Sequence, residues 1–242
     1  MLTDAVAMLQ ARYPGRAIAN YLVLDCETTG FELQRDLVLE FGLVAVRAGQ
    51  VVLRRQIILD WTRQPEVEQA WLEHRLRRAK QRMEKGAKKV CRIDLPYVKR
   101  GVPPGEGLQE LLQILRQQRA DNAYFVGHGI LRFDGFRVQQ SLEEWLGCRW
   151  RFGKHELVDT LALVRADLFP LPRKEGEQFF DYSQRILNAA THVKSSLDGV
   201  CLPRYRLDED GTLAQGAHTA IVDAELTRRL LVRLIPAAGQ VL

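Results

Sequence analysis

The sequence predicts an α/β fold in which helices flank a mixed sheet of five strands. Three β-type runs follow one another closely near the start, separated by short polar stretches, which is the pattern of an antiparallel meander. Two shorter β-type runs come later and alternate with segments of helical periodicity, which favours parallel pairing. The 242 residues are 46% hydrophobic and 27% charged. This composition is typical of a globular protein, and we expect a single domain.

The five predicted strands are apolar runs bounded by turn residues. In chain order they are Tyr21–Asp25, Leu37–Val46, Val51–Leu59, Ala123–Gly127 and Leu157–Thr160. The first three form the meander, because the turn Arg47–Gln50 joins the second run directly to the third. The last two are expected to pair in parallel with it.

Helical periodicity is clearest after Pro65. Apolar residues recur there every three or four positions, at Leu72, Leu76, Ala79, Met83 and Ala87. This long helix is expected to end near Gly86. Other helices are predicted at about Met1–Gln10, after Pro103–Gly105, at about Phe133–Leu146, after the fifth strand, and at about Ala217–Leu234. Residues 169–195 are expected to form a loop with one or two helices.

The positive charge is concentrated in one segment. The chain carries a formal net charge of +5, yet Trp61–Arg100 alone has 12 Lys or Arg against 5 Asp or Glu, a local net charge of +7. A concentrated basic segment suits a polyanionic partner such as nucleic acid, and a solvated helical face is the alternative.

Several protein classes do not fit this sequence. No apolar run approaches the roughly 18 residues that a membrane-spanning helix needs. The first ten residues lack the basic start and apolar centre of a signal peptide. The cysteines Cys26, Cys91, Cys148 and Cys201 lie far apart, with no CxxC pair. We expect a reduced, cytoplasmic protein with no membrane partner.

The sharpest local feature is Leu24–Gly30, at the end of the first predicted strand. Alternate residues of a strand point to the same face, so Asp25 and Glu27 bring two carboxylates side by side. Hard oxygen donors of this kind suit Mg²⁺ or Mn²⁺. Taken alone, the pattern is better explained as an ordinary acidic strand end before a Thr-Thr-Gly turn.

Two further segments carry ionisable groups. Gly127–Asp134 follows the fourth strand, and its Asp134 is placed where a carboxylate can simply cap a helix. His218–Ala224 begins the final predicted helix, with His218 at its start and Asp223 one turn on. Each segment alone has a structural explanation.

Together, in this order and spacing, the three segments resemble the DEDDh 3′→5′ exonucleases, the group that includes the proofreading epsilon subunit of bacterial DNA polymerase III. Family signatures of the types Asp-x-Glu-Thr-Thr-Gly, Gly-His-Asn-x-x-Phe-Asp and His-x-Ala-x-x-Asp-Ala correspond to Asp25–Gly30, Gly127–Asp134 and His218–Ala224. Val158–Leu161 resembles the family's Asp-Thr-Leu element, and Ser196–Leu202 its Leu-x-x-Leu-Cys helix.

The chain departs from the family pattern in two places. Gly129 stands where the family has Asn after His, and one extra residue precedes Phe133. The basic stretch at about 65–90 lies where the family has a much shorter connection, so we interpret it as a helical insertion in a single exonuclease domain spanning residues 1–242.

The resemblance implies a ribonuclease-H-like fold and a two-metal site. Asp25, Glu27, Asp134 and Asp223 would hold two divalent ions, Mg²⁺ or Mn²⁺, and His218 would act as general base. Thr28, Thr29 and Gly30 would present backbone N–H groups to the terminal nucleotide. The remaining expected substrate contacts are Phe31, His128 and the basic-helix residues Arg75, Arg77, Arg78 and Arg82.

The resemblance therefore predicts a metal-dependent 3′→5′ exonuclease that releases nucleoside 5′-monophosphates from single-stranded or frayed 3′ ends of nucleic acid. A proofreading or repair enzyme acting on DNA is the first candidate, and an RNA-processing exoribonuclease of the same fold is the second. A catalytically inactive scaffold that binds nucleic acid or a polymerase is the alternative from another class. The sequence ends without an evident polymerase-binding peptide.

Overall fold

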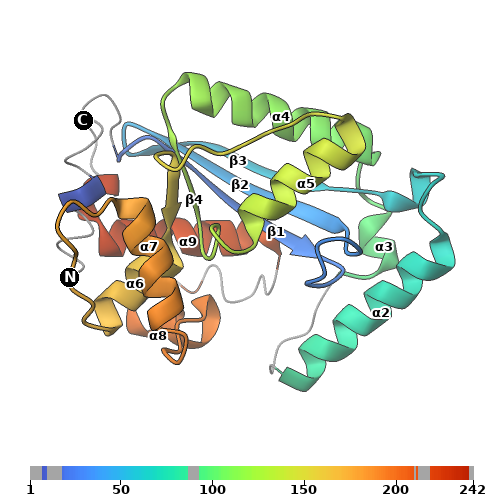
Figure 1. The fold of residues 1–242 in the computed structure, drawn as a ribbon. Helices are drawn as coiled ribbons and strands as arrows, with labels where there is room; N and C mark the ends of the chain where they lie inside the picture. Colours follow the sequence, from blue (N-terminus) through green and yellow to red (C-terminus); the bar gives the residue numbers. More distant parts are fainter. Residues whose placement is uncertain (1–6, 10–17, 87–92, 210, 212–218, 240–242) are drawn as a thin grey trace.

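One mixed sheet of five strands organises the protein (Figure 1). The computed structural model describes residues 7–9, 18–86, 93–209, 211 and 219–239. The strands are β1 Tyr21–Thr28, β2 Val38–Arg47, β3 Gln50–Ile58, β4 Tyr124–Gly127 and β5 Leu157–Asp159, in the spatial order β3-β2-β1-β4-β5. The pairs β1–β2 and β2–β3 are antiparallel, whereas β1–β4 and β4–β5 are parallel. The predicted meander and its two parallel additions are thus confirmed.

Helices lie in the segments in which the apolar periodicity predicts them, and short helices that it does not predict lie at Leu95–Val98 and Leu202–Arg204. In chain order the helices are α2 Gln69–Gly86, α3 Leu95–Val98, α4 Pro104–Ala120, α5 Asp134–Leu146, α6 Thr160–Leu168, α7 Phe179–Ala189, α8 Leu202–Arg204 and α9 Ala220–Leu234. Short 3-10 or π-helical segments are η1 Trp61–Arg63, η2 Leu197–Cys201 and η4 Pro236–Gly239. Of the expected N-terminal helix, residues 7–9 are helical and the rest lies outside the described residues. Within the described ranges, no helix is both long and apolar enough to cross a membrane.

Alternation along β1 divides the core into two layers. Tyr21 and Val23 point to one face of the sheet and pack in a cluster with α6, α7 and α9. Leu22 and Leu24 point to the other face and pack with α4 and α5. Figure 1 shows α4 and α5 on one side of the sheet and α9 on the other. Since Asp25 and Glu27 share the side of Tyr21 and Val23, they face α9.

The parallel strands bring three segments to the same edge of the sheet. β1, β4 and β5 run in the same direction, so the residues that follow them meet where the strands end. The segment after β4 leads to Asp134 at the start of α5, and β5 ends at Asp159.

The thiols of Cys26, Cys148 and Cys201 are free, and Cys91 lies outside the described residues.

Candidate active site

Three carboxylates converge at the end of β1. Asp25 and Glu27 come from the strand, and Asp223 comes from the first turn of α9. One ligand oxygen from each of them lies within 4.8 Å of the others. The structure therefore joins residues that the sequence places far apart, because α9 packs across β1 and β2.

Asp134 completes the acidic group from the other side of β1. Its Oδ1 accepts hydrogen bonds from the backbone N–H of Cys26, at 3.2 Å, and from the Cys26 thiol, at 3.1 Å. Asp134 is buried and lines the same cavity of about 310 Å³ as Asp25, Glu27 and Asp223. Because Cys26 points opposite to its two acidic neighbours, it reaches toward α5 while they face α9.

The electrostatics of this group are unfavourable without a cation. Burial, followed by the charges of Asp134, Asp223 and neighbouring carboxylates, raises the pKa of Asp25 well above its ordinary value. Burial and the Asp223 charge do the same to the pKa of Glu27. Burial also raises the pKa of Asp134 to about 6, although its hydrogen bonds to Cys26 oppose the shift.

This donor set fits divalent metal ions. Oxygen donors from carboxylates are the ligands that Mg²⁺ and Mn²⁺ prefer. Bound cations would also remove the mutual repulsion that raises the pKa values of Asp25 and Glu27. Asp25, Glu27 and Asp223 are placed to hold such ions directly, and Asp134 lines the same cavity.

The loop after β1 is fixed by hydrogen bonds within the protein, which corrects the predicted role of Thr29. Its backbone N–H donates to the carbonyl of Leu37 at 3.0 Å, and its hydroxyl donates to Asp36 at 2.7 Å. Thr29 is fully buried, so it shapes the loop and does not face a nucleotide. Gly30 is required for this shape, because a Cβ there would lie 2.5 Å from the Asp36 carboxylate. Thr28 and Gly30 still line the cavity.

Arg75 also departs from the predicted phosphate-binding role. Its side chain is only 10% exposed and forms an ion pair with Asp36, whose side chain is 1% exposed. The Arg75 Nε donates to Asp36 Oδ1 at 3.0 Å. Because Asp36 already holds Thr29, this ion pair fastens α2 to the loop beside the carboxylates. Arg77 and Arg78 are exposed as expected, and the side chain of Arg82 lies outside the described residues.

An aromatic pair, one ring exposed and the other partly buried, lies at the rim of the cavity. Phe31 is 78% exposed, and its ring centroid lies 5.7 Å from that of Phe133. Both rings line the cavity that holds the carboxylates. A large apolar side chain left in solvent at this position is suited to stacking on a base.

His128 has structural partners on both ring nitrogens. Its Nε2–H donates to the carbonyl of Ser195 at 2.8 Å, and its Nδ1 lies 3.0 Å from the Thr160 hydroxyl. Burial lowers the pKa of His128 to about 4. His128 therefore stays neutral near pH 7 and joins the end of β4 to the segment before η2.

We expect His128→Gln to change how stability depends on pH. The folded-state pKa of about 4 is below the ordinary value of 6.5, so the unfolded chain binds the proton first. The stability that neutral His128 provides is complete above about pH 6.5, and falls by up to about 1.4 kcal/mol per pH unit as the pH drops toward 4. Urea unfolding of the wild type and of His128→Gln in EDTA, from pH 7.5 to 4.5, measures this difference in pH dependence. Parallel pH profiles would contradict it.

Asp159 anchors the loop that leads to Asp134. Its carboxylate accepts the N–H groups of Gly129 and Leu131, each at 3.1 Å, and caps the start of α6 through the N–H of Leu161 at 2.9 Å. Gly129, where the family pattern has Asn, adopts a positive φ of 104° that other residues rarely adopt. Glycine in place of the family's Asn therefore suits the positive φ of the backbone at this position.

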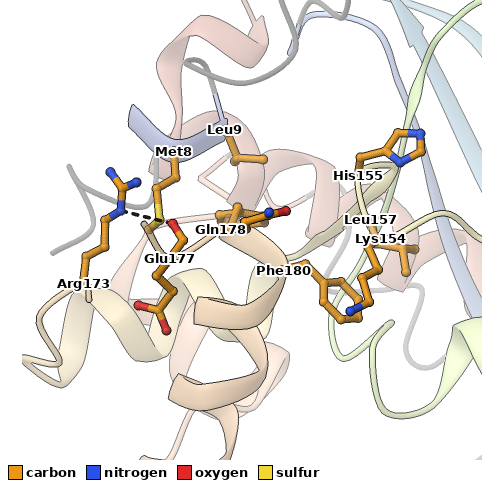
Figure 2. A pocket seen from close by; sticks show the side chains of 10 residues that line it. Met8, Leu9, Lys154, His155, Leu157, Arg173, Glu177, Gln178 and Phe180 are labelled. Atoms are coloured by element: carbon orange, nitrogen blue, oxygen red, sulfur yellow. Dashed lines mark hydrogen bonds between the residues drawn. The ribbon is translucent and has the colours of Figure 1, made fainter. Parts of the chain in front are cut away.

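A second cavity lies away from the carboxylates. Its volume is about 270 Å³, and Figure 2 shows Lys154, His155 and Arg173 among the side chains around it. It shares no lining residue with the carboxylate cavity among the described residues. It borders Leu157, the first residue of β5, whereas the acidic group lies where the parallel strands end. The chemistry of the donors therefore selects the carboxylate cavity as the candidate site.

His218, the predicted general base, lies outside the described residues.

Sequence reasoning misses two buried charged residues around the site. Arg137 of α5 donates to the carbonyls of Gly30, at 2.9 Å, and Asp36, at 3.0 Å. Glu40 of β2 is paired directly with Glu27 across the strands. For Glu40, a charged residue within an apolar strand is the signal available in the sequence.

No protein-family model matches the sequence, and no curated protein matches it significantly. Solved structures do resemble the fold. E. coli exonuclease I in complex with a dA16 oligonucleotide gives a TM-score of 0.56 at 14% identity, covering 91% of this chain and 42% of that chain. The same enzyme with a 5cy-dT13 oligonucleotide gives 0.52 at 14% identity, covering 91% and 41%. Exonuclease I from Methylocaldum szegediense gives 0.52 at 20% identity, covering 91% and 42%.

These comparisons concern the fold. The sheet order, the mixed pairing and the flanking helices are those of the ribonuclease-H-like fold, as predicted. The chain spans about two fifths of the length of these exonuclease I chains. The particular resemblance to the epsilon subunit stays a prediction from the sequence motifs.

Proposed function

We propose that this protein is a metal-dependent 3′→5′ exonuclease that releases nucleoside 5′-monophosphates from single-stranded or frayed 3′ ends. The observation that carries the proposal is the convergence of Asp25, Glu27 and Asp223 within 4.8 Å, with Asp134 in the same cavity. The fold shared with exonuclease I supports it.

The residues divide the chemistry among themselves. Asp25, Glu27, Asp134 and Asp223 would hold two Mg²⁺ or Mn²⁺ ions, which when bound supply charge stabilisation for the attacking and departing oxygens. His218, which precedes the cap of α9 in the sequence, would accept the proton of the attacking water. Phe31 and Phe133 would stack on the terminal base. Arg137 and Asp36 would keep the loop after β1, which carries Phe31, in place.

DNA is the substrate that we favour. The exonuclease I structures that share the fold hold DNA oligonucleotides, which supports this choice. An exoribonuclease of the same fold is the second candidate, because recognition of the 2′-OH decides between the two. An inactive scaffold for nucleic acid or a polymerase is the alternative of another class, and the complete set of carboxylates argues against it. A single domain spanning the whole chain, with α2 as a basic insertion, remains part of this proposal.

Degradation of matched oligonucleotides tests the proposal directly. Single-stranded DNA and RNA of one sequence, each labelled at the 5′ end, are incubated with the protein in Mg²⁺ or in EDTA. We expect a ladder that shortens from the 3′ end in Mg²⁺ alone, with nucleoside 5′-monophosphates as products. Intact DNA and RNA in both conditions would contradict nuclease function and favour the scaffold.

The arginines of α2 other than Arg75 are expected to contact substrate phosphates beyond the cavity. Changing Arg77, Arg78 and Arg82 to Ser should weaken binding of long single strands and flatten the salt dependence of binding. Each phosphate contact contributes about 0.7 to the slope of log affinity against log salt for single strands, so three contacts contribute about 2. Fluorescence anisotropy over a range of salt concentrations measures this slope.

A matched variant controls for net charge. Arg149, Arg173 and Arg206 are also exposed but lie outside α2, so their change to Ser should leave the slope nearly unaltered. Equal slopes for the α2 variant and the wild-type protein would show that α2 is only a solvated face.

A further inference from the structure

Glu40 is a buried carboxylate at the centre of a hydrogen-bond network. Its side chain is completely inaccessible to solvent, on the face of β2 that carries Gly42 and Val44 toward α9. Gln56 of β3 donates to Glu40 Oε1 at 2.9 Å, and the Tyr97 hydroxyl of α3 donates to Oε2 at 2.7 Å. Gln56 also donates to the Tyr97 oxygen at 2.8 Å. The network thus spans two strands and the helix that follows the basic insertion.

The same carboxylate binds the start of α9. The backbone N–H groups of Ala220 and Ile221, the first two residues of that helix, donate to Glu40. Among the described residues, the cap residue Thr219 supplies no side-chain hydrogen bond of its own to these groups. The Glu40 carboxylate of β2 therefore caps α9 in place of an N-cap side chain. Its negative charge complements the positive end of the helix dipole.

The backbones of β2 and α9 meet at the same point. A Cβ on Gly42 would lie 2.1 Å from the carbonyl of Ala220, so only glycine permits this approach. Gly42 sets how near α9 comes to the sheet, and Glu40 sets where its first turn begins. Asp223 lies in that first turn, and its N–H donates to the Thr219 carbonyl at 3.1 Å.

We propose that Glu40 is a positioning residue for the candidate active site: by capping α9 from β2, it holds Asp223 against Asp25 and Glu27. Tyr97 and Gln56 in turn hold the Glu40 carboxylate in the required orientation. This assignment rests on the proposed function, because it concerns the placement of a metal ligand. Glu40 itself is fully buried and forms its hydrogen bonds with Tyr97, Gln56 and the backbone of α9.

Mn²⁺ binding, measured by calorimetry without nucleic acid, tests the assignment. We expect Glu40→Ala to weaken Mn²⁺ affinity by about 10–100-fold, the usual cost of losing a residue that orients a metal ligand. Glu40→Gln keeps an oxygen that can accept the α9 N–H groups, so it should restore most of the affinity. The kcat of oligonucleotide cleavage should follow the same order, with KM little changed. Tyr97→Phe, which removes one hydrogen-bond donor to Glu40, should cause a smaller loss of Mn²⁺ affinity. It provides the test if Glu40→Ala does not fold.

Glu110→Gln is the matched control. Glu110 lies on α4, on the opposite face of the sheet, and pairs with Arg55 at the surface, so this variant should bind Mn²⁺ as the wild type does. Wild-type affinity in folded Glu40→Ala and Tyr97→Phe would overturn the assignment. Equal weakening in Glu40→Ala and Glu40→Gln would also overturn it, since charge and not capping would then matter. A wild-type protein that binds no Mn²⁺ would contradict the proposed function itself.

Discussion

Asp25→Asn is expected to reduce nuclease activity by at least about 10³-fold while making the metal-free protein more stable. A bound metal ion contributes several kcal/mol of charge stabilisation to phosphodiester cleavage, and each 1.4 kcal/mol corresponds to tenfold in rate. The amide keeps the shape of the side chain but is a poorer ligand. It also removes a buried carboxylate whose pKa is raised by burial and by the charges of Asp134, Asp223 and Glu27.

These opposite effects separate loss of chemistry from loss of structure. Glu27→Gln and Asp223→Asn should behave in the same way, because their carboxylates share the same cluster. Cleavage rates in Mg²⁺ and thermal unfolding in EDTA, at pH 8, measure the two quantities. Mg²⁺ should raise the unfolding temperature of the wild type more than that of the variants. Full activity in any variant, or in excess EDTA, would contradict the metal assignment.

His218→Asn is expected to lower kcat by about 10²–10⁴-fold, the usual contribution of general-base catalysis. The proposed base must be neutral to accept a proton, so the wild-type rate should rise with pH as the imidazole loses its own proton. That acidic limb should flatten in the variant, because the titrating group is gone. A pH–rate profile in saturating Mg²⁺ measures both changes.

Metal binding distinguishes a base from a ligand. His218→Asn should bind Mn²⁺ as the wild type does in calorimetry, since the four carboxylates are retained. A variant that loses Mn²⁺ binding would make His218 a ligand or a structural support. The unchanged affinity expected here contrasts with the weakened affinity expected for Glu40→Ala.

Local patterns predict the sheet well because its strands depend on neighbouring residues. The meander follows from apolar runs and one turn, and the pairing of Asp25 with Glu27 on one face follows from strand alternation alone. The meeting of Asp25 with Asp223 could be predicted only through a family resemblance, since no local rule brings α9 onto β1.

The features that sequence reasoning misses depend on distant partners. Arg75 occupies a polar position of the helical pattern, which predicts a side chain available to substrate phosphates, but Asp36 supplies a buried partner. Arg137 binds carbonyls more than one hundred positions away in the chain. Glu40 interrupts an apolar strand, and nothing nearby in the sequence reveals that Tyr97 and the start of α9 satisfy it.

The packing of α9 across β1 has a consequence for the protein during its synthesis. β1 and β2 leave the ribosome before α9, and their antiparallel pairing requires only nearby segments. Asp223 is translated after all five strands. A nascent or prematurely terminated chain that ends before Ala220 carries Asp25 and Glu27 without their third partner, and leaves Glu40 without the helix that it caps. If the carboxylates hold the catalytic metals, cleavage of nucleic acid begins only once α9 has been translated and has docked.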